Sequence, residues 1–360
     1  MAVTSFFLST FLAITLSICN FSKATTFPRA SAILVFGDST VDTGNNKYIQ
    51  TPFRTDHFPY GQDFPGHIPT GRCSNGKLIP DFLGSFLGIK ETIPPFLDPN
   101  LSNQDILTGV CFASAGSGYD YLTTSVSGVI PMSKQLEFFN DYIARLKSIV
   151  GEEEGNKIIG SSLIIVSAGT NDFVYNFYDI PARSLQFNIS SYQDFLLSIL
   201  HDFVKELYNL GGRLMVIAGI PPIGCLPIQI TERMSKNSME RTCLEDENSD
   251  SKAYNMKLKQ LLNQMQASIP QSRIGYANVY DPLFDMISHP QNYGFMETSK
   301  GCCGTGLVEA AALCNEETPT CGIADQFVFW DSVHPTQAAY NYLSDYLIKD
   351  LIPFFTSSTP

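Results

Sequence analysis

Four short runs of apolar residues recur along the chain, and their hydrophobic positions are largely continuous rather than alternating with polar ones. They cover residues 32–36, 163–168, 214–218 and 274–279. Continuous hydrophobicity over so few residues is typical of parallel strands that are buried on both faces. The pattern therefore predicts that these four runs are strands of one parallel sheet.

Segments with apolar residues at three- and four-residue spacing separate these runs. Residues 191–210 and 251–268 show this helical pattern before the third and fourth runs, and residues 340–351 show it near the end of the chain. Alternating strands and helices imply right-handed crossovers, which place helices on both faces of a parallel sheet. The expected fold is α/β, with three α/β/α layers around a central parallel sheet.

Two stretches, residues 52–80 and 300–322, are rich in glycine, proline and cysteine and show no clear period. Such segments are predicted to be long surface loops, which often shape the binding site of an α/β protein. We find no internal repeat, low-complexity tract or long linker. Residues 25–360 are therefore expected to form a single domain.

The beginning of the chain follows a different pattern. Residues 6–19 are an apolar run of the length of a signal-peptide core, and Ser22-Lys23-Ala24 has the small-x-small form of a cleavage site. A spanning helix is the alternative, but it needs about 20 apolar residues and two polar residues cut this run short. We predict that residues 1–24 are a signal peptide and that the secreted chain begins near Thr25, without stable membrane insertion.

Composition and charge limit the classes of partner that the chain can bind. The chain is 44% hydrophobic and 16% charged, which is typical of a globular protein. A formal net charge of -12 and a pI near 4.8 argue against nucleic acid as a partner, because polyanions are bound through clustered Lys and Arg. Asn100 and Asn188 each begin an N-glycosylation acceptor sequence, which agrees with secretion.

Eight of the nine cysteines follow the predicted signal peptide. An even number in an oxidising compartment predicts disulfides, and the shortest loops would be closed by Cys225 with Cys243 and by pairing within residues 302–321. Spacing alone does not fix the connectivity. A zinc site is the alternative, but Cys302 and Cys303 are adjacent and no paired CxxC spacing exists, so no metal is expected. Cys111 also fits a buried small apolar residue.

The first apolar run ends in the polar sequence Gly37-Asp38-Ser39-Thr40. Ser39 therefore follows a parallel strand, at the edge where open α/β sheets bind ligands. Gly37 permits a tight turn, and the polar side chains after it can cap a helix, so a cap and a nucleophile are both open interpretations. A nucleophilic serine requires a base that is oriented by a carboxylate.

Asp331-Ser332-Val333-His334-Pro335 is the sequence that offers such a base. The three-residue spacing places Asp331 and His334 on one side of a turn, before a helix that Pro335 is expected to begin. A capping Asp beside a solvated His is the alternative. His57, His67 and His201 lack a comparable partner, and His289, four residues after an aspartate, precedes a proline in a predicted loop.

Two further stretches offer hydrogen-bond donors for an oxyanion. Gly109–Tyr119 ends in small residues that let backbone N–H groups approach a ligand, although a flexible turn explains it equally. The second apolar strand runs into Gly169-Thr170-Asn171-Asp172. Asn171 is therefore expected beside Ser39 at the same sheet edge, with a simple Asx turn as the alternative.

In this order, these four stretches resemble the motif blocks of the GDSL esterase/lipase family, also called SGNH hydrolases, and most closely its secreted plant branch. They span nearly all of the chain after residue 24. The resemblance implies a flavodoxin-like SGNH hydrolase fold, no cofactor, and secretion into the cell wall or apoplast. It also implies a Ser39 nucleophile, an Asp331–His334 base pair, and an oxyanion hole formed by Ser39, Gly116 and Asn171.

Two residues depart from the family pattern. Thr40 replaces the leucine of the family name at a position outside the chemical roles, and Cys111 stands where the second block commonly has asparagine, which bears on the support of the Gly116 loop. The expected activity is hydrolysis of lipid, cuticle or cell-wall esters through an acyl-enzyme. The alternatives are an acyltransferase that uses the same intermediate, and a catalytically silent binding protein. No GxSxG sequence of the α/β-hydrolase class is present.

Overall fold

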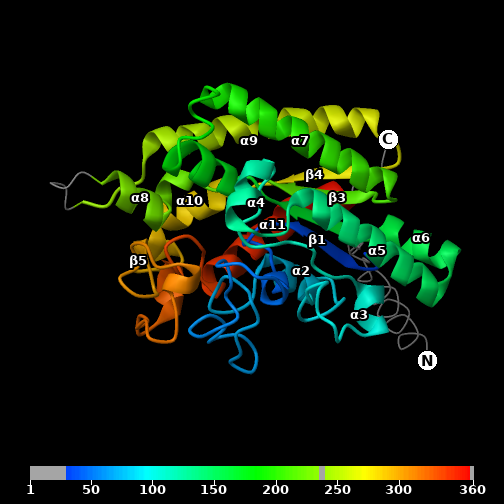
Figure 1. The fold of residues 1–360 in the computed structure, drawn as a ribbon, viewed down its shortest axis with the longest axis horizontal. Coiled ribbons are helices and arrows are strands. Elements are labelled where there is room, and N and C mark those ends of the chain that lie inside the picture. The colour runs from blue at the N-terminus through cyan, green and yellow to red at the C-terminus, as the bar shows by residue number, and fades with distance from the viewer. Residues whose placement is uncertain (1–29, 235–239, 357–360) are drawn as a thin grey trace, which may run out of the picture.

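The computed structural model describes residues 30–234 and 240–356, and a sheet of four parallel strands lies at its centre (Figure 1). The four apolar runs form these strands, which confirms the predicted sheet. The strand order is β1-β2-β3-β4, with Ile33 beside Leu163 at the start of the first pair. The predicted signal peptide lies outside the described residues. The strands are β1 (Ile33–Gly37), β2 (Leu163–Ser167), β3 (Leu214–Ala218) and β4 (Arg273–Ala277).

Helices cover both faces of the sheet, which confirms the three-layer α/β/α fold (Figure 1). On one face, the Phe36 ring of β1 meets Phe139 and Phe203 edge to face. On the other face, Ile165 and Leu347 line a common cavity. The first layer contains α5 (Met132–Val150), α7 (Ile189–Asn209) and α9 (Glu245–Ser268), and the second contains α2 (Ile79–Phe86), α10 (Tyr280–Ser288) and α11 (Gln337–Thr356).

Shorter helical segments connect these layers. One of them, η2, follows β2 and is a π-helical segment, while the other η segments are 3₁₀ turns. The α-helices are α3 (Asn103–Thr108), α4 (Tyr121–Ser127), α6 (Glu152–Ser161) and α8 (Pro227–Arg233), and the other segments are η1 (Asn45–Tyr48), η2 (Asp172–Asp179), η3 (Ile223–Cys225), η4 (Pro290–Asn292), η5 (Ala311–Leu313) and η6 (Ala324–Gln326).

The helix boundaries differ from the prediction by several residues in places, and two helix starts have a clear local cause. Helix α9 begins at Glu245 rather than at residue 251, because its first turn is acidic and lacks the apolar spacing that marks the rest. Helix α11 begins at Gln337 and not at Pro335. The N–H of Ala339 donates to the Thr336 hydroxyl at 3.2 Å, so a threonine cap sets the start of this helix.

An additional extended segment continues the sheet beyond β1. The N–H of Val35 donates to the Val110 carbonyl at 3.1 Å, and the N–H of Phe112 donates to the Val35 carbonyl at 2.7 Å. Cys111 forms a parallel bridge with Val35 between these bonds. This segment was not among the predicted strands, since it is too short to show a period.

A second, smaller unit holds the predicted C-terminal loop. Strands β5 (Glu297–Gly301) and β6 (Phe327–Phe329) pair in parallel, and a separate hydrophobic cluster around Tyr60 and Trp330 lies beside them. Disulfides join Cys302 to Cys321 and Cys303 to Cys314, and a third disulfide joins Cys225 to Cys243.

The prediction of disulfides from the even number of cysteines is wrong for Cys73, whereas Cys111 was also expected as a buried apolar residue. Within the described part of the chain, Cys73 and Cys111 are free and buried. Cys111 lies in the segment beside β1 and is fully buried, which fits its interpretation as a small apolar residue. In the same part of the chain, no helix combines the length and the hydropathy needed to cross a membrane.

Candidate active site

The carboxyl ends of three neighbouring extended segments bring the predicted nucleophile and oxyanion donors to one edge of the sheet. Ser39 follows β1, Asn171 follows β2, and Gly116 follows the segment 110–112 that pairs with β1. Ligands bind at this edge in open α/β sheets. The parallel pairing thus gathers residues that lie far apart in the sequence.

The turn after β1 requires glycine. Gly37 has a φ of 138°, and a Cβ at this position would lie 1.8 Å from the Ser167 carbonyl oxygen. The buried Gln135 side chain of α5 accepts a hydrogen bond from the Gly37 N–H at 2.8 Å and donates one to its carbonyl at 2.9 Å. The backbone before Ser39 is therefore fixed on both sides. Nothing in the local sequence pattern indicated this role of Gln135.

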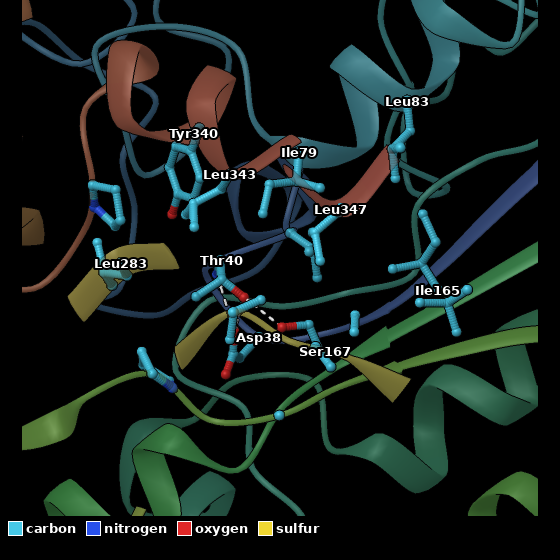
Figure 2. A pocket seen from close by; sticks show the side chains of 18 of the residues that line it. Asp38, Thr40, Ile79, Leu83, Ile165, Ser167, Leu283, Tyr340, Leu343 and Leu347 are labelled. Atoms are coloured by element: carbon cyan, nitrogen blue, oxygen red, sulfur yellow. Dashed lines mark hydrogen bonds between the residues drawn. The ribbon is translucent and has the colours of Figure 1, made fainter. Parts of the chain in front are cut away.

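Asp38 is a buried carboxylate next to Ser39, the nucleophile candidate. Its Oδ1 accepts hydrogen bonds from the Thr40 N–H at 2.9 Å and the Thr40 hydroxyl at 2.7 Å, and that hydroxyl lies 2.9 Å from the Ser167 hydroxyl (Figure 2). Burial raises the pKa of Asp38 to about 6, although the bonds from Thr40 lower it. Thr40, the departure from the family name, thus links β1 to β2 by a hydroxyl that leucine lacks.

Side chains from residues 42–46 hold the loop that carries Gly116. Asp42 accepts from the Ala115 N–H at 2.9 Å, and the Asn46 amide donates to the Ala115 carbonyl at 2.9 Å. The Asn45 amide donates to the carbonyls of residues 111 and 113, each at 2.8 Å. The loop is therefore well supported although cysteine occupies position 111. Burial raises the pKa of Asp42 to about 6.

Asn171 and Asp172 connect β2 to the same loop. The Asn171 amide nitrogen donates to the Ser117 carbonyl at 2.8 Å, which uses one of its two N–H groups. Asp172 accepts from the N–H groups of Tyr119 and Asp120 at 2.8 and 3.0 Å. Burial raises the pKa of Asp172 to about 7. These hydrogen bonds thus hold the end of β2 against the loop that carries Gly116.

Asp331 and His334 contact each other as their spacing predicted. The His334 Nδ1 lies 2.9 Å from Oδ1 and 2.8 Å from Oδ2 of Asp331. Asp331 Oδ1 also accepts from the backbone N–H groups of Val333 and His334 at 2.8 and 2.7 Å. Asp331 is fully buried and His334 is 8% exposed. The carboxylate therefore fixes the turn and the imidazole together.

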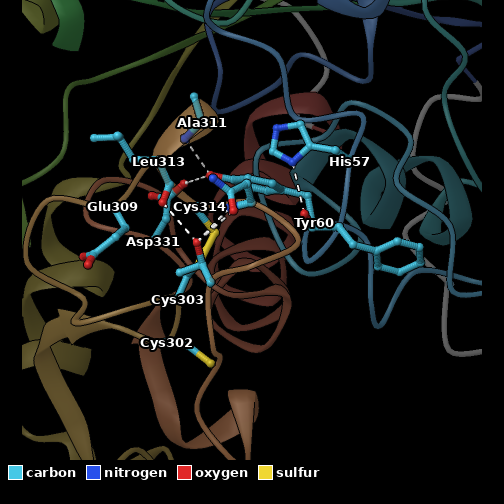
Figure 3. Close-up of a disulfide and its surroundings, with 12 residues drawn as sticks. His57, Tyr60, Cys302, Cys303, Glu309, Ala311, Leu313, Cys314 and Asp331 are labelled. Carbon is cyan, nitrogen blue, oxygen red and sulfur yellow. Dashed lines mark hydrogen bonds between the residues drawn. A yellow bond between two sulfur atoms is a disulfide. The ribbon is translucent and has the colours of Figure 1, made fainter.

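Tyr60 is a residue of this site that sequence reasoning missed. Its hydroxyl donates to Asp331 Oδ2 at 2.7 Å and accepts from the Ala311 N–H at 2.8 Å (Figure 3). Tyr60 is fully buried, and burial together with the charge of Asp331 raises its pKa well above the ordinary value. Ala311 lies in the loop that the Cys303–Cys314 disulfide closes. No local signal marked Tyr60, because it lies in a stretch without a period.

The His57 ring packs edge to face against Tyr60, with the ring centroids 5.6 Å apart, whereas His289 and His201 lie outside this arrangement. His289 contacts Asp285 at 2.8 Å on an exposed surface, and His201 contacts Asp202 at 3.0 Å, also exposed. Among the residues that the structure describes, no group of three or more His, Cys, Asp or Glu side chains is placed to hold a metal ion.

One cavity joins the two halves of the site. Ser39, Asn171 and His334 all line it. Asp38 and Thr40 also line it, as Figure 2 shows. Its further wall is aliphatic and runs along the sheet face that α2 and α11 cover. Ser39 is 6% exposed, so the nucleophile candidate lies in a largely enclosed space.

Comparisons with known proteins show the family of the chain. A GDSL esterase/lipase of Arabidopsis thaliana is 54% identical over 340 residues, which cover 94% of each chain, and another is 52% identical over 320 residues, which cover 89% of each. A catalytic mutant of an acetylxylan esterase from Geobacillus stearothermophilus is 13% identical, with 92% of this chain and 97% of that chain covered, at a TM-score of 0.38 that is too low to carry an argument. The family profile described as GDSL-like lipase/acylhydrolase matches residues 33–347. The chain therefore belongs to the GDSL-like lipase/acylhydrolase family of ester hydrolases.

Proposed function

We propose that the protein hydrolyses carboxylic esters through an acyl-enzyme on Ser39. The observation that carries this proposal is the Asp331–His334 contact in the cavity that Ser39 also lines. With Nδ1 engaged by the carboxylate, the other ring nitrogen of His334 is the one available to a serine hydroxyl. If Asp331 were only a helix cap and His334 only a solvated side chain, neither would need to be buried or to share a cavity with Ser39.

In the first step, Ser39 Oγ attacks the ester carbonyl carbon while His334 takes the hydroxyl proton. The bond to the alcohol oxygen then breaks, and His334 gives its proton to the leaving alcohol. In the second step, water attacks the acyl carbon and gives a proton to His334; the bond to Ser39 Oγ then breaks, and His334 returns the proton to Ser39 Oγ as the acid leaves. Because His334 must be neutral to accept a proton, acid pH lowers the rate.

The negative charge that develops on the carbonyl oxygen needs donors that are already in place. The N–H groups of Ser39 and Gly116 and the amide N–H of Asn171 that Ser117 does not use fill this role in the proposal. Gly116 has a φ of 87°, which favours glycine. Asp331 stabilises the imidazolium form of His334 while the charge is present.

We also propose that the protein acts outside the cell, in the wall or apoplast. The apolar leader, the three disulfides in the described residues and the two acceptor sequences support this. Asn100 and Asn188 are both exposed, so either can carry a glycan.

The proposal is tested by treating the purified protein with a fluorophosphonate probe and mapping the labelled peptide by mass spectrometry. We expect labelling at Ser39, and we expect Ser39→Ala to remove it. Ser332→Ala is a matched control, because Ser332 is a buried serine beside His334 whose hydroxyl has no partner among the described groups. Folded protein that the probe leaves unlabelled would favour the silent binding protein instead.

A second assay separates hydrolysis from acyl transfer. The acyl-enzyme is the same in both reactions, so the products must be compared in the presence of an added alcohol. Release of the free acid at moderate alcohol concentration supports the hydrolase. Formation of the new ester as the main product would make the protein an acyltransferase.

A further inference from the structure

The cavity at Ser39 extends well beyond the catalytic groups, into the space between the sheet and the second helix layer. Its deep wall contains Leu163 and Ile165 of β2, Val216 of β3, and Leu347 and Leu351 of α11. We infer that this deep part, termed here the chamber, binds the hydrocarbon chain of a linear acyl ester of about ten to twelve carbons. This inference rests on the proposed function, since it assigns the acyl part of the same substrate.

The alternation of side chains along the strands explains why the chamber exists. Leu163, Ile165 and Ser167 share one face of β2, and this face is turned toward α11. At the carboxyl end of β3, Ala218 pairs with Ala277 of β4 on the same face, and both line the cavity where it leads away from Ser39. Their short side chains leave room where larger residues would contact the helices.

The chamber leads from the nucleophile to the opposite end of the sheet. Thr40 and Ser167 lie at its catalytic end, and Ile165 and Leu83 lie further along (Figure 2). From Tyr340 to Leu351, α11 rises about 16 Å at 1.5 Å per residue. An extended chain advances roughly 1.3 Å per methylene, so this length corresponds to about ten to twelve carbons.

The chemistry of the wall selects a hydrocarbon rather than a sugar. Apart from the polar side chains of residues 38–40, 167, 170, 171 and 334 at the catalytic end, the only polar side chain among the described lining residues is Tyr340, which is 1% exposed. A sugar buried there would lose most of its hydrogen bonds to water, because the unpaired Tyr340 hydroxyl could replace only a few of them. An acyl chain loses none, and its transfer out of water is favourable.

The acyl part, and not the alcohol part, matches the chamber. The alcohol must leave after the first step and water must then enter, whereas the acyl group stays attached to Ser39 through both steps. The alcohols of glycerides and wall esters also carry further polar groups, which the aliphatic wall cannot bond. The alcohol part therefore lies toward the opening of the cavity.

The test compares kcat/KM for p-nitrophenyl esters from two to sixteen carbons, below their micelle concentrations. We expect decanoate to exceed butanoate by on the order of 100-fold, because each buried methylene contributes to transition-state binding. Leu347→Trp fills the chamber and should lower this ratio at least about tenfold. Tyr346→Trp is the matched control, since Tyr346 is the neighbouring residue of α11 and is 38% exposed; it should keep the wild-type ratio. Equal ratios in wild type and Leu347→Trp would overturn the inference.

A binding measurement tests the chamber without relying on turnover or on the Leu347→Trp variant alone. Ser39→Ala should bind dodecanoate but not butanoate in calorimetry, and adding Val216→Leu, a smaller change than Leu347→Trp, should weaken dodecanoate binding. Butanoate hydrolysis without dodecanoate binding would reject the chamber and leave the proposed function intact. Dodecanoate binding by a wild-type protein that hydrolyses no ester would reject the function and support the hydrocarbon site alone.

Discussion

The two halves of the candidate active site are held in place by different means. Ser39, Gly116 and Asn171 follow extended segments of the central sheet, and their loops are fixed by buried hydrogen bonds such as those of Gln135. The half that contains Asp331 and His334 lies between β6 and α11, outside that sheet. It is held by a small cluster with two disulfides and by the Tyr60 hydroxyl.

This difference follows from how each half obtains its rigidity. Strand ends of a parallel sheet have fixed neighbours, because every backbone bond along the strand sets the register. A loop outside the sheet lacks that constraint, so crosslinks and side-chain bonds must limit its freedom. Changes in the nucleophile half should therefore affect catalysis through single donors, and changes in the base half through the whole Asp331–His334 turn.

The largest effect is expected from the carboxylate of the base half. Asp331→Asn leaves an acceptor for the backbone but presents an amide to His334 Nδ1, which favours the wrong tautomer and should lower kcat about 10⁴-fold. Steady-state kinetics on a p-nitrophenyl ester measures this. Asp325→Asn, an exposed aspartate of the same loop region, is the control. A loss below about tenfold would remove Asp331 from the mechanism.

In the nucleophile half, loss of one oxyanion donor should lower kcat less than the Asp331→Asn change does. Asn171→Ala removes one proposed oxyanion donor and should lower kcat by about 10²- to 10³-fold with little change in KM. The bond to the Ser117 carbonyl is also lost, so circular dichroism must show an intact fold. Unchanged turnover on every ester tested would show that Asn171 only ties the loop to β2.

Tyr60 provides the next smaller effect and the sharpest test of the base half. Tyr60→Phe removes a hydrogen bond to a charged group and leaves the Ala311 N–H without a partner, so kcat should fall about tenfold. Asp331 then accepts one hydrogen bond fewer, so its negative charge stabilises the imidazolium form of His334 more strongly. The acid limb of the pH–rate profile should therefore move to higher pH, and a purely structural role would not move it.

The disulfide that closes the Ala311 loop should act through the same contact. The double change Cys303→Ala with Cys314→Ala should cost about 2–3 kcal/mol of unfolding free energy and lower kcat about as much as Tyr60→Phe. Combining it with Tyr60→Phe should add little further loss, because both remove one contact. Fully additive losses in kcat would separate the disulfide from Tyr60.

The last expected effect concerns stability rather than turnover, and it is a pH dependence that arises in the nucleophile half. Because burial raises the pKa of Asp172 to about 7, the folded state holds its proton more tightly than the unfolded chain does. This stabilisation is present at acid pH and is lost as the pH rises through about 7, by at most ~1.4 kcal/mol per pH unit. Asp172→Asn should flatten this slope in urea unfolding between pH 4.5 and 7.5. Asp325→Asn, on an exposed aspartate of η6, should leave it unchanged.

The elements that the sequence predicted well are those whose pattern is local. The buried strands appear as continuous apolar runs, and the Asp331–His334 contact depends on a three-residue spacing that a single turn realises. The start of α11 was predicted wrongly at Pro335, because proline is favoured in a first turn but the Thr336 cap decides where the helix begins. The prediction for Cys73 failed because an even count of cysteines does not require each to be paired.

By itself, the sequence determined the strands, the order of the four motifs and the residue types that the chemistry needs. The tertiary structure alone decided which distant groups meet. Tyr60 and Asp331, 271 residues apart, share a hydrogen bond, and Ala218 beside Ala277 opens the chamber behind Ser39. Local patterns encode periodicity and burial, whereas such contacts depend on how whole elements pack, and packing is set by many side chains that no single motif contains.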